Sequence, residues 1–186
     1  MHHLDAMKDK IARLRTLGAE EELERRWDED DDYAERYNDP RLSLPGGTEI
    51  EDDRPAALKA LYLETDGARF GDVKFRRANK FRGQVAVDAL GEPIDDRDRL
   101  QIGDVGERAI LLDTASGAVI VYWYGYSRAG WETGVVIECA DVAEFVGTVA
   151  LGPRYRELYG TPEKQKTPWW DRDPWHVYLT EIGMAG

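Results

Sequence analysis

Closely spaced carboxylates are the residues of this sequence whose types and spacing could do chemistry. Glu64 and Asp66 stand in the stretch ETDG, and Asp95 with Asp96 makes another pair. Two such groups act as general acid and base when a cleft drives their pKa values apart. The chain has 37 acidic residues, so close pairs also arise by chance. We therefore interpret ETDG as a helix end that Gly67 closes in a left-handed conformation, with the two acids beside it.

Other residue types that catalyse reactions or bind cofactors are sparse. His2 and His3 lie in a start segment that we expect to be mobile, and His176 stands alone between apolar neighbours. Cys139 alternates with its neighbours in an expected strand, which predicts a buried, inert thiol. The glycine-bearing stretch IGDVGERA lacks the Lys-Ser/Thr pair of a phosphate loop. We expect no catalytic residue, no metal site and no cofactor, and keep an enzyme of unknown chemistry as a third alternative.

The charge of the chain restricts its partners. The net charge is −12, which repels nucleic acids and anionic membranes. A basic protein partner is compatible with this charge, although composition alone favours charge kept for solubility. A single cysteine excludes an intramolecular disulfide framework. The sequence contains no apolar signal core and no membrane-spanning run, which favours a cytoplasmic protein.

The N-terminal third divides into a helix and a charged stretch. Leu4, Met7, Ile11 and Leu14 fall at alternating three- and four-residue steps, which predicts a helix with one apolar stripe. We expect the stripe to pack on its own domain, while packing on a second chain stays open. The acidic run at 28–32 repels itself and predicts a solvated linker. These patterns assign residues 1–53 to an N-terminal helix and acidic linker.

Residues 54–186 form the expected body of the protein. A helix follows Pro55 and ends before Gly67, and ERAILLDTASGAVIVYWYGY at 107–126 is typical of a β-hairpin. TGVVIEC predicts another strand, and ADVAEFVGTVAL a helix that Asp141 caps. The Trp-rich C-terminal tail ends in a short helix with Asp173 as cap. Strands gathered between helices predict an α+β fold: a central, mainly antiparallel sheet flanked by helices, with an extra N-terminal helix.

Aromatic residues concentrate in and after the second strand of the hairpin. Strand alternation places Tyr122 and Tyr124 on one face of the sheet and Trp123 on the other, with Tyr126 and Trp131 just beyond. Tyrosine and tryptophan at a partly exposed surface anchor protein interfaces. Helices packed on both faces would instead bury all of them, so binding and core packing both remain open.

The order of these parts resembles the SUKH superfamily. A helix ending in ETDGARF, the stretch IGDVGERAILLDTASGAVIVY, and a strand leading into ADVAEFVGTVAL follow the family's sequence of motifs across roughly residues 54–151. The positions that carry the resemblance are Gly67, Phe70, Gly103, Gly106, Asp113, Phe145 and Val146.

The resemblance implies a non-enzymatic α+β binding module. Members include immunity proteins of bacterial toxin systems and fungal cell-wall regulators of Smi/Knr type. We expect an immunity protein that occludes a cognate toxin, such as a basic nuclease; the alternative is a regulatory or scaffold protein that binds the cell's own proteins. The candidate contact residues are Tyr124, Tyr126 and Trp131, with Glu64 and Asp66 as steering charges. The oligomeric state stays open.

Overall fold

The structure, a computed structural model, describes residues 2–185 and confirms an α+β fold built on an eight-stranded antiparallel sheet. The strand order is β1-β2-β3-β5-β6-β7-β8, and β4 pairs beside β5. The strands are β1 (Leu42–Ser43), β2 (Arg69–Phe70), β3 (Val73–Phe75), β4 (Arg82–Gly83), β5 (Arg99–Val105), β6 (Arg108–Asp113), β7 (Val119–Tyr122) and β8 (Val135–Cys139).

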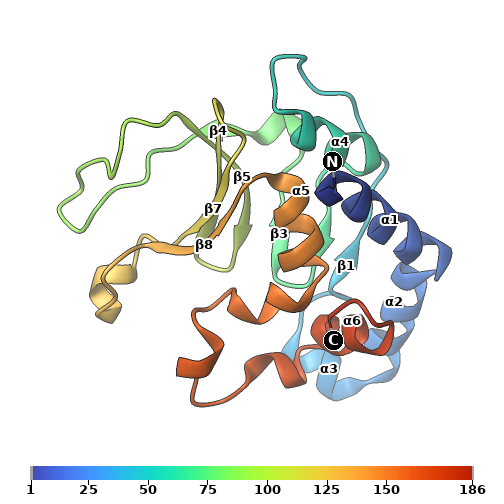
Figure 1. Cartoon of the computed structure of the whole chain (residues 1–186). Coiled ribbons are helices and arrows are strands. Elements are labelled where there is room, and N and C mark those ends of the chain that lie inside the picture. The colour runs from blue at the N-terminus through green and yellow to red at the C-terminus, as the bar shows by residue number, and fades with distance from the viewer. Residues whose placement is uncertain (1, 186) are drawn as a thin grey trace.

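Helices flank the sheet on one side, as Figure 1 shows for α1, α4 and α5. On the opposite side the connection between β4 and β5 projects as a long loop, residues 84–98, which we call the finger. The α-helices are α1 (His2–Thr16), α2 (Ala19–Glu29), α3 (Asp31–Arg36), α4 (Ala56–Glu64), α5 (Val142–Glu144) and α6 (Pro174–Glu181). A π-helical turn, Phe145–Ala150, continues α5, and short 3-10 turns complete the tail.

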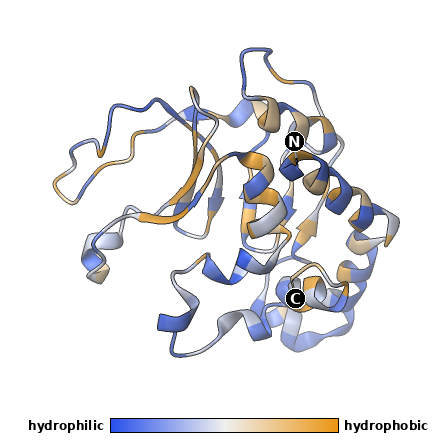
Figure 2. Cartoon of the chain, viewed as in Figure 1, coloured by the Kyte–Doolittle hydropathy of each residue, from blue (hydrophilic) through white to orange (hydrophobic). Residues whose placement is uncertain are grey.

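Both faces of the central strands are buried, but against different partners. Ile110 and Leu112 of β6 face the main core under the helices. Ala109 and Leu111 alternate with them and face a second, smaller core that contains Ala86 at the base of the finger. Hydrophobic residues accordingly colour the central strands and α5 in Figure 2. The helix-free face of the sheet is therefore covered by loops.

The predicted apolar stripe of the N-terminal helix is confirmed, and it packs within the same chain. Met7, Ile11 and Leu14 of α1 are fully buried and join the main core, as does Leu23 of α2. Their burial removes apolar surface from water and stabilises the contact of α1 with α4 and α5. The first fifty residues therefore share one core with the residues that follow.

The predicted acidic linker is wrong at residues 28–32, because this run completes α2 and begins α3. Asp30 caps α3 by accepting a hydrogen bond from the backbone N–H of Tyr33 at 3.0 Å. Asp31 and Asp32 then lie in the first turn of α3, where negative charge interacts favourably with the helix dipole. Glu29 pairs with Arg25 one turn earlier on α2. Local interactions at the helix ends thus outweigh the repulsion among the carboxylates.

The predictions for the centre of the chain are correct for the hairpin and incomplete before it. β6 and β7 pair antiparallel, and Asp141 caps α5 through the backbone N–H of Glu144 at 2.7 Å, as the sequence predicts. A polar residue and a glycine interrupt the apolar pattern of β5, which pairs with both β3 and β6. Gly103 lies within this strand, where a Cβ would stand 2.5 Å from the carbonyl oxygen of Lys74. Only Gly106, with φ of +55°, belongs to the turn.

Candidate functional site

Three tyrosines form a packed cluster at the C-terminal end of β7. The rings of Tyr122 and Tyr124 meet edge to face at 5.0 Å between centroids, and those of Tyr122 and Tyr126 at 6.4 Å. The sequence places Tyr122 and Tyr124 on one face, which this contact bears out, although β7 ends at Tyr122 and Tyr124 lies in a turn. Tyr126 is only 7% exposed, so it offers little surface to a partner.

The hydroxyls of this cluster support the finger. Tyr122 donates a hydrogen bond to the carbonyl oxygen of Val87 at 2.6 Å, and Tyr124 donates to that of Val85 at 2.8 Å. The side-chain amide of Gln84 donates to the Tyr124 oxygen at 3.0 Å. The candidate contact residue Tyr124 therefore positions the base of the finger, while its ring stays half-buried.

Trp131 lies at a groove of about 730 Å³ beside β8. Its indole meets that of Trp123 edge to face at 5.1 Å. Trp131 is half-buried, so part of the ring faces solvent. The opposite wall comes from residues 159–166 of the tail, including Tyr159. β8 is the last strand in the sheet, so its outer edge has no neighbouring strand among the described residues.

The guanidinium of Arg108 contacts aromatic rings on both sides of the groove. The guanidinium carbon of Arg108 lies 4.7 Å from the ring centroid of Trp123 and 4.7 Å from that of Tyr159. Such contacts contribute about 0.5–2 kcal/mol each, depending on exposure. Lys164, Lys166 and Glu132 give the groove charges of both signs. The groove therefore supplies ordered aromatic contact area and little net charge for steering.

Glu64 and Asp66 lie on other elements and do not join the aromatic residues. Glu64 ends α4 and accepts a hydrogen bond from Arg15 of α1 at 2.9 Å. Asp66 accepts one from the backbone N–H of Ala78 at 2.7 Å, at the start of a 3-10 turn. Gly67 has the predicted left-handed conformation, with φ of +85°, but it lies two residues beyond the extended cap Thr65 and so does not itself close α4. Both carboxylates thus hold local structure together, and their steering role remains a prediction.

A buried ionic network lies where the sequence offers no signal. Arg41, 3% exposed, bonds through Nη2 to Asp72 at 2.5 Å and to Asp173 at 2.8 Å. Its guanidinium stands over the ring of Tyr37 at 4.5 Å. Arg41 has φ of +74°, an uncommon conformation for a residue with a side chain. The surrounding contacts must compensate for that strain.

Tyrosine hydroxyls complete the network. Tyr159 donates to the Asp72 carboxylate at 2.7 Å, and the backbone N–H of Asp72 donates to the hydroxyl oxygen of Tyr155 at 2.8 Å. Asp173 also caps α6 through the backbone N–H of His176 at 3.0 Å. Burial raises the pKa of the Asp173 carboxyl above its ordinary value. These groups join three distant segments, and their hydrogen bonds and ion pairs suit a structural tie.

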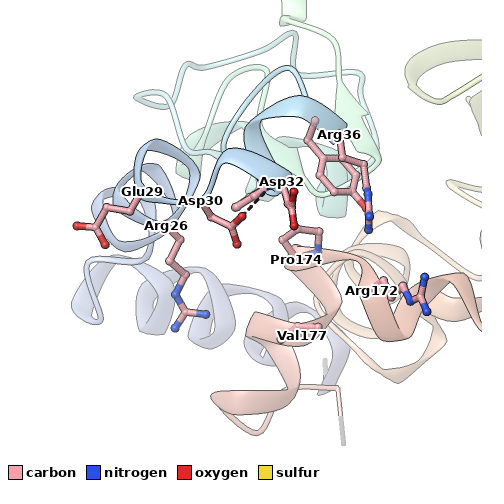
Figure 3. Close-up of a pocket in the computed structure, with 10 residues that line it drawn as sticks. Arg26, Glu29, Asp30, Asp32, Arg36, Arg172, Pro174 and Val177 are labelled. Carbon is pink, nitrogen blue, oxygen red and sulfur yellow. Dashed lines mark hydrogen bonds between the residues drawn. The ribbon is translucent and has the colours of Figure 1, made fainter.

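A mixed-charge pocket of about 560 Å³ opens between α2–α3 and α6. Figure 3 shows Arg36 and Arg172 at one end and Arg26 at the other, with Asp30 and Asp32 between them. The Asp30 carboxylate is occupied by the capping bond that the dashed line marks. Arg26 pairs with glutamates of α2 and α6. The lining contains neither serine, cysteine nor histidine. It therefore offers no serine or cysteine nucleophile paired with a histidine base.

Cys139 is expected to resist thiol reagents until the protein unfolds. The side chain is buried on β8, and burial raises the pKa of its thiol to about 12. At pH 8 the thiol is protonated in the folded protein, and a protonated thiol is a poor nucleophile. Labelling with a chromogenic disulfide should therefore be at least tenfold slower in buffer than in concentrated urea. Equal rates in the two conditions would contradict this placement of Cys139.

Residues 2–185 hold no metal cluster and no membrane-spanning helix, and no known protein compared with the chain matches it. Among residues 2–185, no group of three or more His, Cys, Asp and Glu side chains is arranged to hold a metal ion. The helices in that range are too short or too polar to span a membrane. No family model matches the sequence, and neither a curated protein nor a solved structure matches the chain.

Proposed function

We propose that this chain is a non-enzymatic protein-binding module of SUKH type, an immunity protein that neutralises a cognate toxin by occlusion. The bound toxin is a basic domain, such as a nuclease, whose active-site surface the module covers. The order of motifs across residues 54–151 and the antiparallel α+β architecture support the choice of family. The net charge of −12 supports the choice of a basic partner, because it accelerates encounter with a cationic surface.

The observation that carries the proposal is the aromatic groove beside β8. Half-buried indoles held in place at a surface opening are the anchors that protein interfaces use, because they bury large apolar area at small entropic cost. Trp131 is fixed by Trp123, and Trp123 in turn by Arg108. The free edge of β8 along the groove adds backbone groups that an extended partner segment can pair with.

The buried titratable groups support binding over catalysis. The Asp173 carboxylate accepts hydrogen bonds from Arg41 and from a helix N–H, and the Asp72 carboxylate accepts bonds from Arg41 and Tyr159. A general acid or base needs a proton-transfer partner in a cleft open to substrate. In this network both carboxylates hold the tail against the body of the protein. This is the arrangement expected of a rigid binding scaffold.

Replacing Trp131 with alanine is expected to weaken partner binding about tenfold or more. The chain would first be used as bait in extracts of the source cells at low and high salt, and the retained protein would be identified and purified. Its affinity for the wild type, for Trp131→Ala and for Trp170→Ala would then be measured by titration calorimetry. Trp170 is a half-buried indole of the tail outside the groove and serves as the control.

A basic toxin domain retained at low salt and released at high salt is the expected result. Equal affinities of the Trp131→Ala and Trp170→Ala variants would remove the groove from the interface. A retained protein that belongs to the cell's own wall-synthesis machinery would favour the Smi/Knr-type regulator instead. If no protein is retained at either salt concentration, the binding function itself is wrong.

A further inference from the structure

The finger exposes apolar side chains to a degree that few other parts of the protein match. Leu90 at its tip is 87% exposed, Val85 on one arm 55%, and Ile94 on the other arm 39%. Of the large apolar side chains exposed among the described residues, only Leu17 and Leu63 lie elsewhere. Scattered single exposures are normal, but three within ten residues of one projecting loop concentrate exposed apolar side chains on that loop.

The tip of the finger is ordered by its own hydrogen bonds. The Asp88 carboxylate accepts from the backbone N–H of Leu90 at 2.8 Å and from that of Glu92 at 3.0 Å. The backbone N–H of Asp88 donates to the Glu92 carbonyl at 2.7 Å, and Gly91 supplies the positive φ of +88° that the turn requires. The backbone at Leu90 is therefore held in one conformation, so binding has less backbone disorder to remove.

The base of the finger is fixed as well. Tyr122 and Tyr124 bond its first arm through their hydroxyls. Arg99, itself buried at the start of β5, holds the Asp95 carboxylate of the second arm with two bonds of 2.6 Å. The backbone N–H of Ile94 donates to the carbonyl of Ala86 at 3.0 Å and joins the two arms. These hydrogen bonds thus fix the base of the finger to the sheet.

Acidic residues follow the finger from its tip along its second arm. Between residues 88 and 98 the sequence has five carboxylates and one arginine. Asp88 and Asp95 are engaged in the bonds described above, while Glu92, Asp96 and Asp98 are exposed. Figure 2 shows hydrophobic and hydrophilic segments side by side along the finger. A surface complementary to this one has an apolar pocket with lysine or arginine at its rim.

We propose that the finger is the docking element of the protein and that Leu90 inserts into an apolar pocket with a basic rim on a partner protein. This inference rests on the proposed binding function. It adds which element of this protein makes the first contact and what chemistry the partner's surface has there. A second copy of this chain is a disfavoured occupant, because two molecules of charge −12 repel each other. An anionic membrane is disfavoured for the same reason.

The test compares two exposed leucines. Leu90→Ser removes the apolar tip, and Leu63→Ser removes a leucine of α4 that is 58% exposed and far along the chain from the finger. Both changes replace exposed side chains, and circular dichroism melting curves would verify that both variants fold. The partner is the protein retained by the wild type from source-cell extracts, identified by mass spectrometry and purified. Affinities for all three chains are measured by biolayer interferometry.

The expected result is a basic partner that binds Leu90→Ser roughly thirtyfold more weakly than the wild type, with Leu63→Ser within twofold of it. A further variant, Glu92→Gln with Asp96→Asn, should slow association and flatten its salt dependence while leaving dissociation unchanged. A partner that binds Leu90→Ser and Leu63→Ser equally well would overturn the role of the finger and leave the proposed function standing.

Two other outcomes also decide the question. If the retained partner is acidic, or if sedimentation shows that the wild type dimerises and Leu90→Ser does not, the basic-rimmed pocket is the wrong receiver. If the wild type retains no protein, the proposed function and the role of the finger fail together.

Discussion

Replacing Arg41 with methionine is expected to lower the free energy of unfolding by about 3–5 kcal/mol. Methionine keeps much of the volume, so the change removes charge more than packing. Arg41 is the cation that Asp72 and Asp173 share, and Asp173 is buried. Without the guanidinium, two neighbouring carboxylates repel each other, one of them away from water. Urea unfolding followed by fluorescence measures the loss, since several tryptophans lie near the network.

The loss should depend on pH with a definite sign. Burial already raises the pKa of Asp173, and removing Arg41 raises it further. A carboxyl with a raised pKa in the folded state favours folding at low pH, and this contribution disappears as pH rises through the folded pKa. The difference in unfolding free energy between wild type and Arg41→Met should thus be largest near neutral pH. It should shrink as the pH falls toward the ordinary pKa range of aspartate.

A matched control separates burial from charge removal. Arg25 pairs with Glu22 and Glu29 on the exposed face of α2. Such surface pairs contribute less than about 1 kcal/mol, so Arg25→Met should leave the unfolding curve nearly unchanged. Equal losses for Arg41→Met and Arg25→Met would show that the network contributes no more than a surface pair.

Replacing Trp175 with alanine is expected to cost about 3–5 kcal/mol of unfolding free energy. Trp175 is fully buried, and its indole N–H donates to the carbonyl of Ala150 at 3.0 Å. Its ring packs near Phe70 of β2 and Tyr178 of α6, with centroids 6.3 and 6.2 Å away. The substitution leaves a cavity and an unpaired carbonyl between the sheet and the tail. Differential scanning calorimetry measures the change.

Trp170 again provides the comparison. It lies on the partly exposed side of the tail and is half-buried, so Trp170→Ala should cost far less than Trp175→Ala. If the two substitutions cost the same, the tail does not depend on Trp175 for its attachment. The expected contrast would make residues 152–185 an integral part of the body, although the family resemblance inferred from the sequence ends near residue 151.

The sequence predicts those elements whose determinants are local. The hairpin of β6 and β7, the apolar stripe of α1 and the caps at Asp141 and Asp173 each depend on residues a few positions apart, and all are confirmed. β5 is obscured because a buried polar residue, Gln101, and the strand-interior Gly103 interrupt its apolar pattern. Its membership of the sheet follows from pairing with β3 and β6, which no short window reveals.

The candidate site is only partly visible in the sequence. Aromatic concentration indicates the region of Trp131, and strand alternation groups Tyr122 with Tyr124. That Tyr124 supports the finger depends on where β7 ends, at Tyr122, and on a hydroxyl contact with a loop 39 residues earlier. The ion pairs of Arg41 leave no local signal in the sequence, because the carboxylates that it binds, Asp72 and Asp173, come from remote segments. Long-range charge pairing is the information that the residue pattern lacks.

The ion pair between Arg41 and Asp173 has a consequence for synthesis. The two residues are 132 positions apart in sequence, so Asp173 is synthesised long after the arginine with which it pairs. Until then Arg41, with its strained backbone, has no ion pair with Asp173, and Phe70 is not packed against Trp175. Although nascent domains often begin to fold from the N-terminus, the final closure of this protein must wait until the tail has left the ribosome.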